Sequence, residues 1–181
     1  MSNVVAYEVV DRVAHVIIDR PDVRNAMDLA VFDELHGRAE QIAEDPHVGA
    51  VVLRGRGGNF SSGLDVSIFN ELAEEGSQDE EAVASLISRL QSAFNAYEDL
   101  AVPTIAAIEG YALGAGLQLA LACHLRMAAP SAQLSVMEPR WGLVPDLGGT
   151  YRLPRLVGLG RATELALTTR VLDADEALKL G

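Results

Sequence analysis

Two glycine-rich stretches each follow a short apolar run and precede a segment with helical character. The first covers residues 55–65, and the second is the turn around Gly114, Ala115 and Gly116 within residues 104–123. A strand, a glycine turn and a helix start together aim free backbone N–H groups and the positive end of a helix dipole at one point. Such a point suits an anion, or an oxygen that becomes an anion during a reaction.

Other sites built on glycine do not match these stretches. A dinucleotide fingerprint needs Gly or Ala three residues after Gly116, where the chain has Leu119. The Gly-Lys-Ser/Thr of a phosphate loop and the Gly-x-Ser-x-Gly of a nucleophile elbow are both absent from the sequence. Cys123 and His124 have no second ligand pair at a suitable spacing, so no metal is expected. Two turns that supply two N–H donors to one oxygen form an oxyanion hole without a nucleophile, suited to a thioester carbonyl that gains enolate charge.

The composition indicates one ordinary globular domain, residues 1–181. Of the 181 residues, 49% are hydrophobic and 22% are charged. The net charge of -12 argues against nucleic acid or an anionic membrane as a partner. The single cysteine excludes an internal disulfide. No signal peptide is evident, and no apolar run approaches the ~20 residues of a membrane span. We therefore expect a cytoplasmic protein.

The elements that must position the two turns follow from the apolar pattern. Strands alternating with helices predict an α/β fold. Strands are expected at residues 4–10 and 13–18 (a hairpin), 48–53 (buried on both sides), 105–108, 125–128 and 133–135. Helices are expected at 28–44 with Asp28 as N-cap, 82–100, the segment after Gly116, 137–141, a segment ending at 157, 161–167 and 175–180. The acidic residues 70–81 are predicted to form a surface loop.

Four segments, in the same order, resemble the crotonase family, the enoyl-CoA hydratases and isomerases. Residues 61–65 and 110–116 are similar to the two signature segments of the family, residues 20–27 to its N-terminal CoA-contact region, and residues 138–150 to its catalytic-acid segment. The resemblance implies a crotonase-type spiral of repeated ββα units with helices packed around the sheets. It also implies a homotrimer or a dimer of trimers, and a chain that lacks the C-terminal helical segment of the family.

The resemblance assigns roles to residues of the two turns. The oxyanion hole is expected to be the backbone N–H groups of Leu64 and Ala115. Substrate or CoA contacts are implied for Arg24, Ala26, Ser62 and Gly63. For Arg24, a solvated loop arginine is an equal alternative, and Asp65 is expected to cap the following helix. CoA enters as part of the acyl-CoA substrate, so no separate cofactor is implied.

The reacting groups are the most informative part of the resemblance. Family hydratases use two glutamates; the second is matched by Glu138, and the first falls at Gln118. A glutamine can orient a water or a carbonyl but cannot transfer a proton. The pattern therefore favours double-bond isomerisation, with Glu138 moving the proton, over hydration, in fatty acid metabolism. A surface carboxylate is the alternative for Glu138.

Two further questions stay open from the sequence. Asp146 aligns with an acidic residue of the dienoyl-CoA isomerase branch, so it is either a second catalytic carboxylate or the N-cap of a helix that starts near Gly148. The loss of one glutamate also leaves a second function class, a catalytically impaired acyl-CoA binding or scaffold protein.

Overall fold

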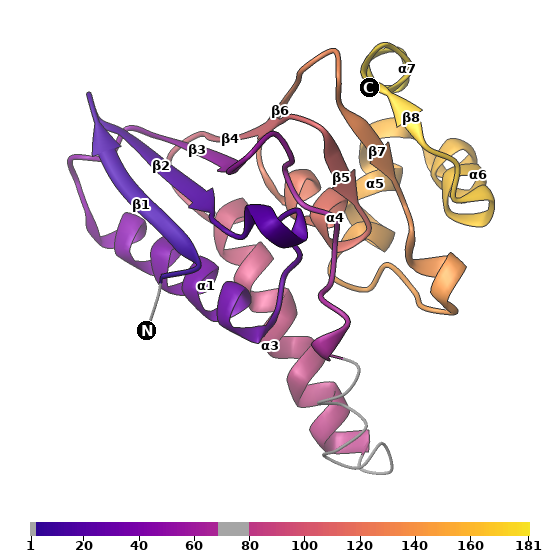
Figure 1. The fold of residues 1–181 in the computed structure, drawn as a ribbon, viewed down its shortest axis with the longest axis horizontal. Helices are drawn as coiled ribbons and strands as arrows, with labels where there is room; N and C mark the ends of the chain where they lie inside the picture. Colours follow the sequence, from indigo (N-terminus) through magenta and orange to yellow (C-terminus); the bar gives the residue numbers. More distant parts are fainter. Residues whose placement is uncertain (1–2, 69–79) are drawn as a thin grey trace.

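Two sheets form the framework of the protein in the computed structural model, which describes residues 3–68 and 80–181 (Figure 1). The larger sheet has the strand order β1 (Val5–Val10), β2 (Val13–Ile18), β3 (Ala50–Gly55), β4 (Thr104–Ile108) and β6 (Leu125–Ala128). Its first two strands are an antiparallel hairpin, as predicted, and its other pairings are parallel. The smaller sheet has the order β5 (Tyr111–Leu113), β7 (Gln133–Ser135) and β8 (Leu172–Asp173).

The chain passes repeatedly from the larger sheet to the smaller one and then into a helix. β4 leads to β5 and then to α4 (Ala115–Ala122), and β6 leads to β7 and then to the short 3-10 helix η2 (Glu138–Trp141). β3 begins an equivalent passage, in which Ser61 pairs with Ala112 of β5 through an isolated bridge. These repeated units are the expected crotonase-type spiral, so the predicted fold class is confirmed.

Two long helices lie side by side along one face of the larger sheet, α1 (Leu29–Glu44) and α3 (Glu80–Glu98) (Figure 1). The predicted N-cap of α1 is confirmed, because the Asp28 carboxylate accepts the Val31 N–H at 3.0 Å. The Phe32 and Phe94 rings stack with centroids 5.3 Å apart, so the two helices share one apolar seam.

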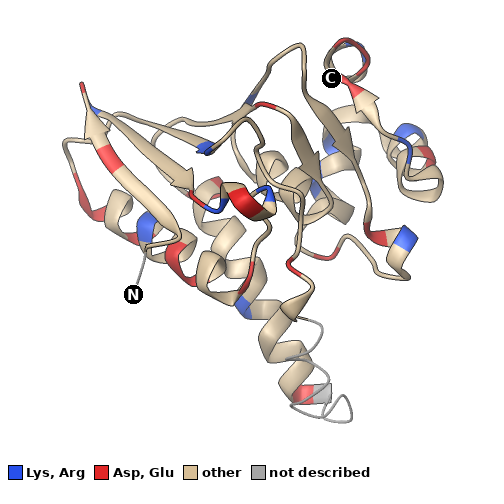
Figure 2. Ribbon diagram, viewed as in Figure 1, with Lys and Arg blue, Asp and Glu red and all other residues tan. Residues whose placement is uncertain are grey.

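The helix α4 runs through the centre of the molecule. All eight of its residues are buried, and none carries a charge, so it is drawn entirely in tan in Figure 2. A helix that is apolar on every side needs cover all round. On its far side this cover comes from α5 (Gly149–Val157), with α6 (Leu159–Thr168) and α7 (Ala174–Leu180) beyond (Figure 1).

The structure differs from the predicted elements in a few places. β3 starts two residues later than expected and alternates between buried and half-buried positions, so the prediction that it is buried on both sides is wrong. The short elements β5, β8 and η1 (Pro21–Val23) were not predicted, because two or three residues are too few to show a period. The predicted surface loop lies mostly outside the described residues. None of the described helices is long and apolar enough to cross a membrane.

Candidate active site

The two glycine turns lie against each other. Gly63 has φ +106°, and a Cβ atom at this position would lie 2.9 Å from the Leu113 carbonyl oxygen and 3.7 Å from the Ala115 nitrogen. Only a glycine permits this close approach. The sequence prediction that the two turns act at one place therefore has the geometry it requires.

The backbone on either side of Leu64 directs its own N–H away from the neighbouring chain. Met27 donates to the Gly63 carbonyl and accepts from the Asp65 N–H, both at 2.9 Å, so the Leu64 N–H lies on the opposite edge. The Ala115 N–H is in the first turn of α4, where no intrahelical acceptor exists. Within the described residues, neither N–H donates a hydrogen bond to the protein.

A buried asparagine holds the first turn in place. The Asn25 Nδ2 donates to the carbonyls of Arg56 (2.9 Å) and Asn59 (2.7 Å), and its Oδ1 accepts from the Arg20 N–H (2.9 Å). Asn25 has φ +57°, a left-handed conformation that asparagine tolerates better than most residues. Sequence reasoning noted Asn25 only as part of a motif and gave it no role of its own.

Asp65 makes a local capping contact, although most of the segment that it was predicted to cap lies outside the described residues. Its carboxylate accepts the Ser67 N–H at 3.0 Å and an Arg20 guanidinium N–H at 2.9 Å. The hydrogen bond from the Ser67 backbone is the largest cause that lowers the pKa of Asp65, and the Arg20 charge acts in the same direction. Asp65 is thus a structural carboxylate that stays ionised.

The residues with implied CoA contacts form one continuous patch beside the first turn. The Arg24 carbonyl accepts the Ser62 N–H at 3.0 Å, and the Ser62 hydroxyl donates to the Val23 carbonyl at 3.4 Å. The exposed Arg24 guanidinium lies 5.5 Å from the centroid of the Tyr111 ring, which holds it at the surface. Ala26 is half-buried and Gly63 is buried, and the Gly63 carbonyl accepts the N–H of Met27, the residue that follows Ala26.

Glu138 is not a surface carboxylate, so that alternative is wrong. Only 7% of the residue is exposed, and its Oε1 accepts the Gln118 Nε2–H at 2.6 Å. Gln118 in turn accepts the Gly149 N–H at its Oε1, at 2.9 Å. The second carboxylate oxygen, Oε2, is buried and has no hydrogen-bond partner among the described residues. The structure therefore brings Gln118 and Glu138 together at the site where the resemblance implied a pair of glutamates.

Glu138 is also close to the second glycine turn. A Cβ atom at Gly114 would lie 3.3 Å from the Glu138 Oε1. Burial raises the pKa of Glu138 and is the largest cause. Hydrogen bonding from its own backbone N–H, from Gln118 and from the Met137 backbone opposes the rise, and the negative charge of Asp146 adds to it. A carboxyl group with a raised pKa beside a turn of free N–H groups is suited to proton transfer.

Asp146 does not cap a helix. The N-cap position of α5 is Gly148 and has no side-chain cap, so that alternative is wrong. Asp146 is exposed, and its backbone carbonyl accepts the Gln91 Nε2–H at 2.7 Å. Partial desolvation raises the pKa of its carboxyl group. It acts on the site through its charge and is not among the residues that line the cavity described next.

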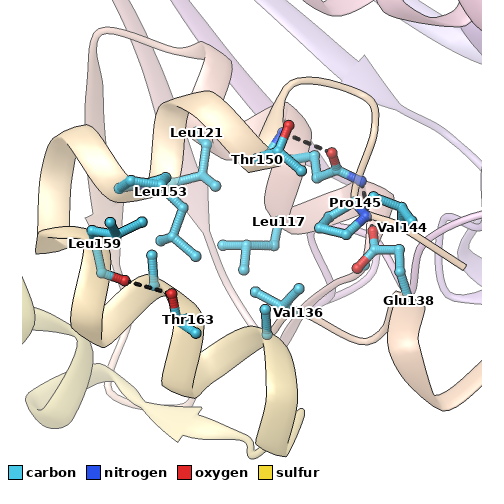
Figure 3. A pocket seen from close by; sticks show the side chains of 16 residues that line it. Leu117, Leu121, Val136, Glu138, Val144, Pro145, Thr150, Leu153, Leu159 and Thr163 are labelled. Carbon is cyan, nitrogen blue, oxygen red and sulfur yellow. Dashed lines mark hydrogen bonds between the residues drawn. The ribbon is translucent and has the colours of Figure 1, made fainter.

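A cavity of about 290 Å³ opens beside Glu138 (Figure 3). Glu138 and Gln118 form its polar end, and Glu138 is the one ionisable residue among those that line it. The opposite end is aliphatic, with Leu121, Leu153 and Leu159 around it (Figure 3). The Thr163 hydroxyl donates to the Leu159 carbonyl at 2.9 Å, so it presents no free polar group to this end. The cavity can take a hydrocarbon chain whose polar head lies near Glu138.

Among the described residues, no group of three His, Cys, Asp or Glu side chains is arranged to hold a metal ion. Cys123 is buried, and burial raises the pKa of its thiol to about 12. A thiol in this state is neither a ligand nor a nucleophile at neutral pH.

Comparison with known proteins decides the family. Residues 8–181 match the family described as Enoyl-CoA hydratase/isomerase. The chain belongs to this family.

Relatives of known name cover almost the whole chain. It is 40% identical over 173 residues to the peroxisomal fatty acid beta-oxidation multifunctional protein AIM1 of Arabidopsis thaliana, and covers 23% of that protein. It is 40% identical over 170 residues to the human mitochondrial enoyl-CoA hydratase domain-containing protein 2, and covers 56% of it. These alignments include 94% and 93% of the chain. The chain thus spans about a quarter of the plant protein and just over half of the human one.

Solved structures with the same fold include members of the enoyl-CoA hydratase/isomerase family. A putative enoyl-CoA hydratase from Thermobifida fusca, in complex with acetoacetyl-CoA, matches with a TM-score of 0.88 and 37% identity. The match covers 98% of this chain and 71% of that one. Pseudomonas aeruginosa DspI matches with a TM-score of 0.89 and 34% identity, over 99% of this chain and 71% of that one.

The sequence did not reveal the role of one residue of the site, Gly149. Gly149 was identified only as part of a motif, yet its N–H fixes Gln118. A Cβ atom at Gly149 would lie 2.9 Å from the Gln118 Oε1 and 3.1 Å from the Pro145 Cβ. The Gly148-Gly149 pair was the available signal, but only the structure shows which side chain the second glycine faces.

Proposed function

We propose that this protein moves the double bond of an enoyl-CoA thioester, with Glu138 as the group that carries the proton. The observation that supports this most directly is the buried Glu138 carboxylate at the polar end of an apolar cavity, bonded to a neutral amide where a hydratase has a second glutamate. One carboxylate suffices for a proton shuttle, whereas hydration through two glutamates needs both. Relatives named for fatty acid beta-oxidation favour a role in fatty acid metabolism.

The proposed reaction needs no second reactant. The Glu138 carboxylate removes a proton from C2 of a 3-enoyl thioester, and the electrons of that C–H bond form a dienolate. The thioester oxygen takes up the negative charge, and the N–H groups of Leu64 and Ala115 stabilise it. Glu138 then returns the proton to C4, and the electron pair leaves the oxygen. The product is a 2-enoyl thioester, and Glu138 is a carboxylate again.

The CoA part of the substrate is proposed to lie on the patch formed by Arg24, Ala26, Ser62 and Gly63. Arg24 supplies a positive charge for a phosphate group in a chain with a net charge of -12. A solved relative is described as a complex with CoA, and another as a complex with acetoacetyl-CoA. CoA enters as part of the substrate, and no separate cofactor is proposed.

A pair of absorbance assays tests the reaction. A 3-enoyl-CoA that isomerises gains the absorbance of a conjugated thioester, whereas crotonyl-CoA that is hydrated loses it. We expect the gain to be much faster than the loss. Glu138→Gln should reduce the gain by about 10²–10⁴-fold, the usual contribution of a positioned acid–base group. Glu8→Gln, an exposed carboxylate on β1, is the matched control and should leave the rate unchanged. Normal turnover by the Glu138 variant would exclude this assignment.

A second candidate function follows from the same glutamine. Because Gln118 replaces a proton-transfer group, the chain is also compatible with an acyl-CoA binding or scaffold protein that has lost catalysis. Tight binding of acyl-CoA without turnover of 2-enoyl or 3-enoyl substrates would favour this function over isomerisation.

A further inference from the structure

The Gln118 amide has one orientation that its surroundings allow. The backbone N–H of Gly149 can only donate, so the group that faces it at 2.9 Å must be the carbonyl oxygen of Gln118. The NH₂ group then faces the Glu138 Oε1 at 2.6 Å. Gln118 is 3% exposed, which leaves no solvent to replace either contact if the amide turns over. The contact from Gly149 therefore makes Gln118 a donor, and never an acceptor, toward Glu138.

The two oxygens of Glu138 are consequently different. A proton on Oε1 would make this oxygen a poorer acceptor for the Gln118 N–H and weaken the charge-assisted hydrogen bond between them. Oε2 is buried and has no hydrogen-bond partner among the described residues. A carboxyl group that gains a proton in this setting holds it on Oε2.

We propose that Gln118 is a positioning residue that keeps Oε1 of Glu138 as a permanent acceptor, so that Oε2 alone exchanges the proton with the substrate. Gly149 is needed for this arrangement for two reasons. Its N–H donates to the Gln118 Oε1, and the absence of a side chain at Gly149 leaves room for the Gln118 amide. The proposal rests on the proposed function for the identity of the reaction. The arrangement of the three groups does not depend on turnover.

Other charged groups near Glu138 are engaged elsewhere, with one exception. Arg140 of η2 donates to the Thr169 hydroxyl at 3.0 Å. On α5, Arg152 pairs with Glu98 at 2.6 Å and Arg155 lies over the Tyr151 ring, and on α6 Arg161 pairs with Glu164 at 3.4 Å. α4 carries no charge. Asp146 remains, and its negative charge acts on Glu138 in every variant alike.

Two variants remove the contact in different ways. Gln118→Met keeps the length of the side chain but cannot donate a hydrogen bond. Gly149→Ala keeps the amide but places a Cβ atom 2.9 Å from the Gln118 Oε1, which displaces it. Gly160→Ala is the matched control, because a Cβ atom at this helical glycine of α6 meets nothing within 4 Å.

The readout is the ¹³C titration of the Glu138 carboxyl group by NMR, in protein labelled at the glutamate Cδ, with Glu138→Gln to assign the signal. A hydrogen bond to a charged group is lost in both variants, so the acid dissociation constant of Glu138 should fall about 10- to 100-fold in Gln118→Met and in the same direction in Gly149→Ala. Gly160→Ala should titrate as the wild type does. If Gln118→Met and Gly149→Ala both titrate at the wild-type pH, the proposal is wrong.

The same variants can be tested by the pH dependence of kcat/KM, which would not change if Gln118 had only a structural role. The acidic limb of the kcat/KM profile for 3-enoyl-CoA should move to higher pH together with the NMR titration, because the carboxylate form is the base. A wild-type protein that turns over no enoyl-CoA would overturn the proposed function, while the NMR titration would still decide the role of Gln118. A shifted titration with an unmoved kinetic limb would mean that Oε2 of Glu138 is not the atom that exchanges the proton.

Discussion

The buried side-chain amides of Asn25 and Gln118 differ in what their hydrogen bonds hold in place. Asn25 donates both amide N–H groups to carbonyls of the first glycine turn and accepts the Arg20 N–H at its oxygen, so its hydrogen-bond network is closed. The Gln118 oxygen accepts the Gly149 N–H, and its NH₂ group donates to the Glu138 carboxylate, whose other oxygen has no hydrogen-bond partner in the described part of the chain. The Gln118 network ends at a cavity, whereas the Asn25 network ends in backbone.

The difference between the two networks suggests that one contributes mainly to folding stability and the other mainly to catalysis. Burying a polar group costs free energy unless a hydrogen bond compensates for it, and a closed network compensates fully. The Glu138 Oε2 has no hydrogen-bond partner among the described residues, so its burial is compensated less completely than that of the Asn25 amide. Residues around Asn25 should therefore matter for folding, and residues around Gln118 for turnover.

The largest effect is expected from Asn25→Leu. This change removes three hydrogen bonds between a buried side chain and half-buried or exposed backbone. It should lower the free energy of unfolding by about 2–4 kcal/mol, since each such hydrogen bond contributes about 0.5–1.5 kcal/mol. Urea denaturation measures the loss. Gln133→Leu replaces an exposed amide on β7 and should change stability by less than about 0.5 kcal/mol. Equal losses in the two variants would remove the distinction between a closed buried network and any other amide.

The next effect concerns activity at the open network. Gln118→Glu places a carboxylate oxygen where the amide nitrogen lies, 2.6 Å from the Glu138 Oε1. Two carboxylates at this distance cannot both ionise, so the pair shares a proton and provides one acid and one base. Crotonyl-CoA hydration should rise at least about tenfold above the wild-type rate, as measured by loss of conjugated absorbance. No gain in a variant that still binds acyl-CoA would mean that more than Gln118 separates this site from a hydratase.

The residues of the candidate site could largely be predicted from the sequence, but the hydrogen bond that orients Gln118 could not. The two glycine turns, Glu138 and Gln118 were identified from motifs because motif positions fix local geometry. The N-cap at Asp28 was predicted because a cap is a local contact. The contact from Gly149 to Gln118 joins residues 31 positions apart, so no local pattern reports it.

The wrong predictions for Asp146 and β3 also concern features that depend on tertiary packing. Asp146 was a plausible cap from its position before the glycine pair, but α5 begins later, at Gly149. β3 was predicted to be buried on both sides from its composition, although only tertiary packing decides which of its positions are covered. The role proposed for Glu138 remains a prediction that the Glu138→Gln assay decides, and the roles of the Leu64 and Ala115 N–H groups also remain predictions.

A smaller effect should appear in the stability of Glu138→Gln. Because burial raises the pKa of Glu138, the folded state prefers the protonated form, and this stabilisation is present at low pH and lost as the pH rises through the raised pKa. Glutamine avoids this loss, so the variant should be more stable than the wild type at pH 7.5 by about 1 kcal/mol, or roughly 2–4 °C in Tm. Thermal melts at pH 4 and pH 7.5 test this, and the difference should vanish at pH 4. A wild type that is the more stable protein at pH 7.5 would show that Glu138 has a compensating partner.

The smallest effect is expected from Asp146→Asn, and it decides the role of this carboxylate. Its negative charge adds to the rise in the pKa of Glu138, so its removal should move the acidic limb of the kcat/KM profile to lower pH. The exposed position of Asp146 keeps this shift small, with less than about a threefold change in kcat at pH 7.5. If Asp146 instead transferred a proton itself, kcat would fall by about 10²-fold or more at every pH. Glu8→Gln, with the same change in net charge on a distant strand, should leave the limb in place, which separates the local field of Asp146 from the overall charge of the protein.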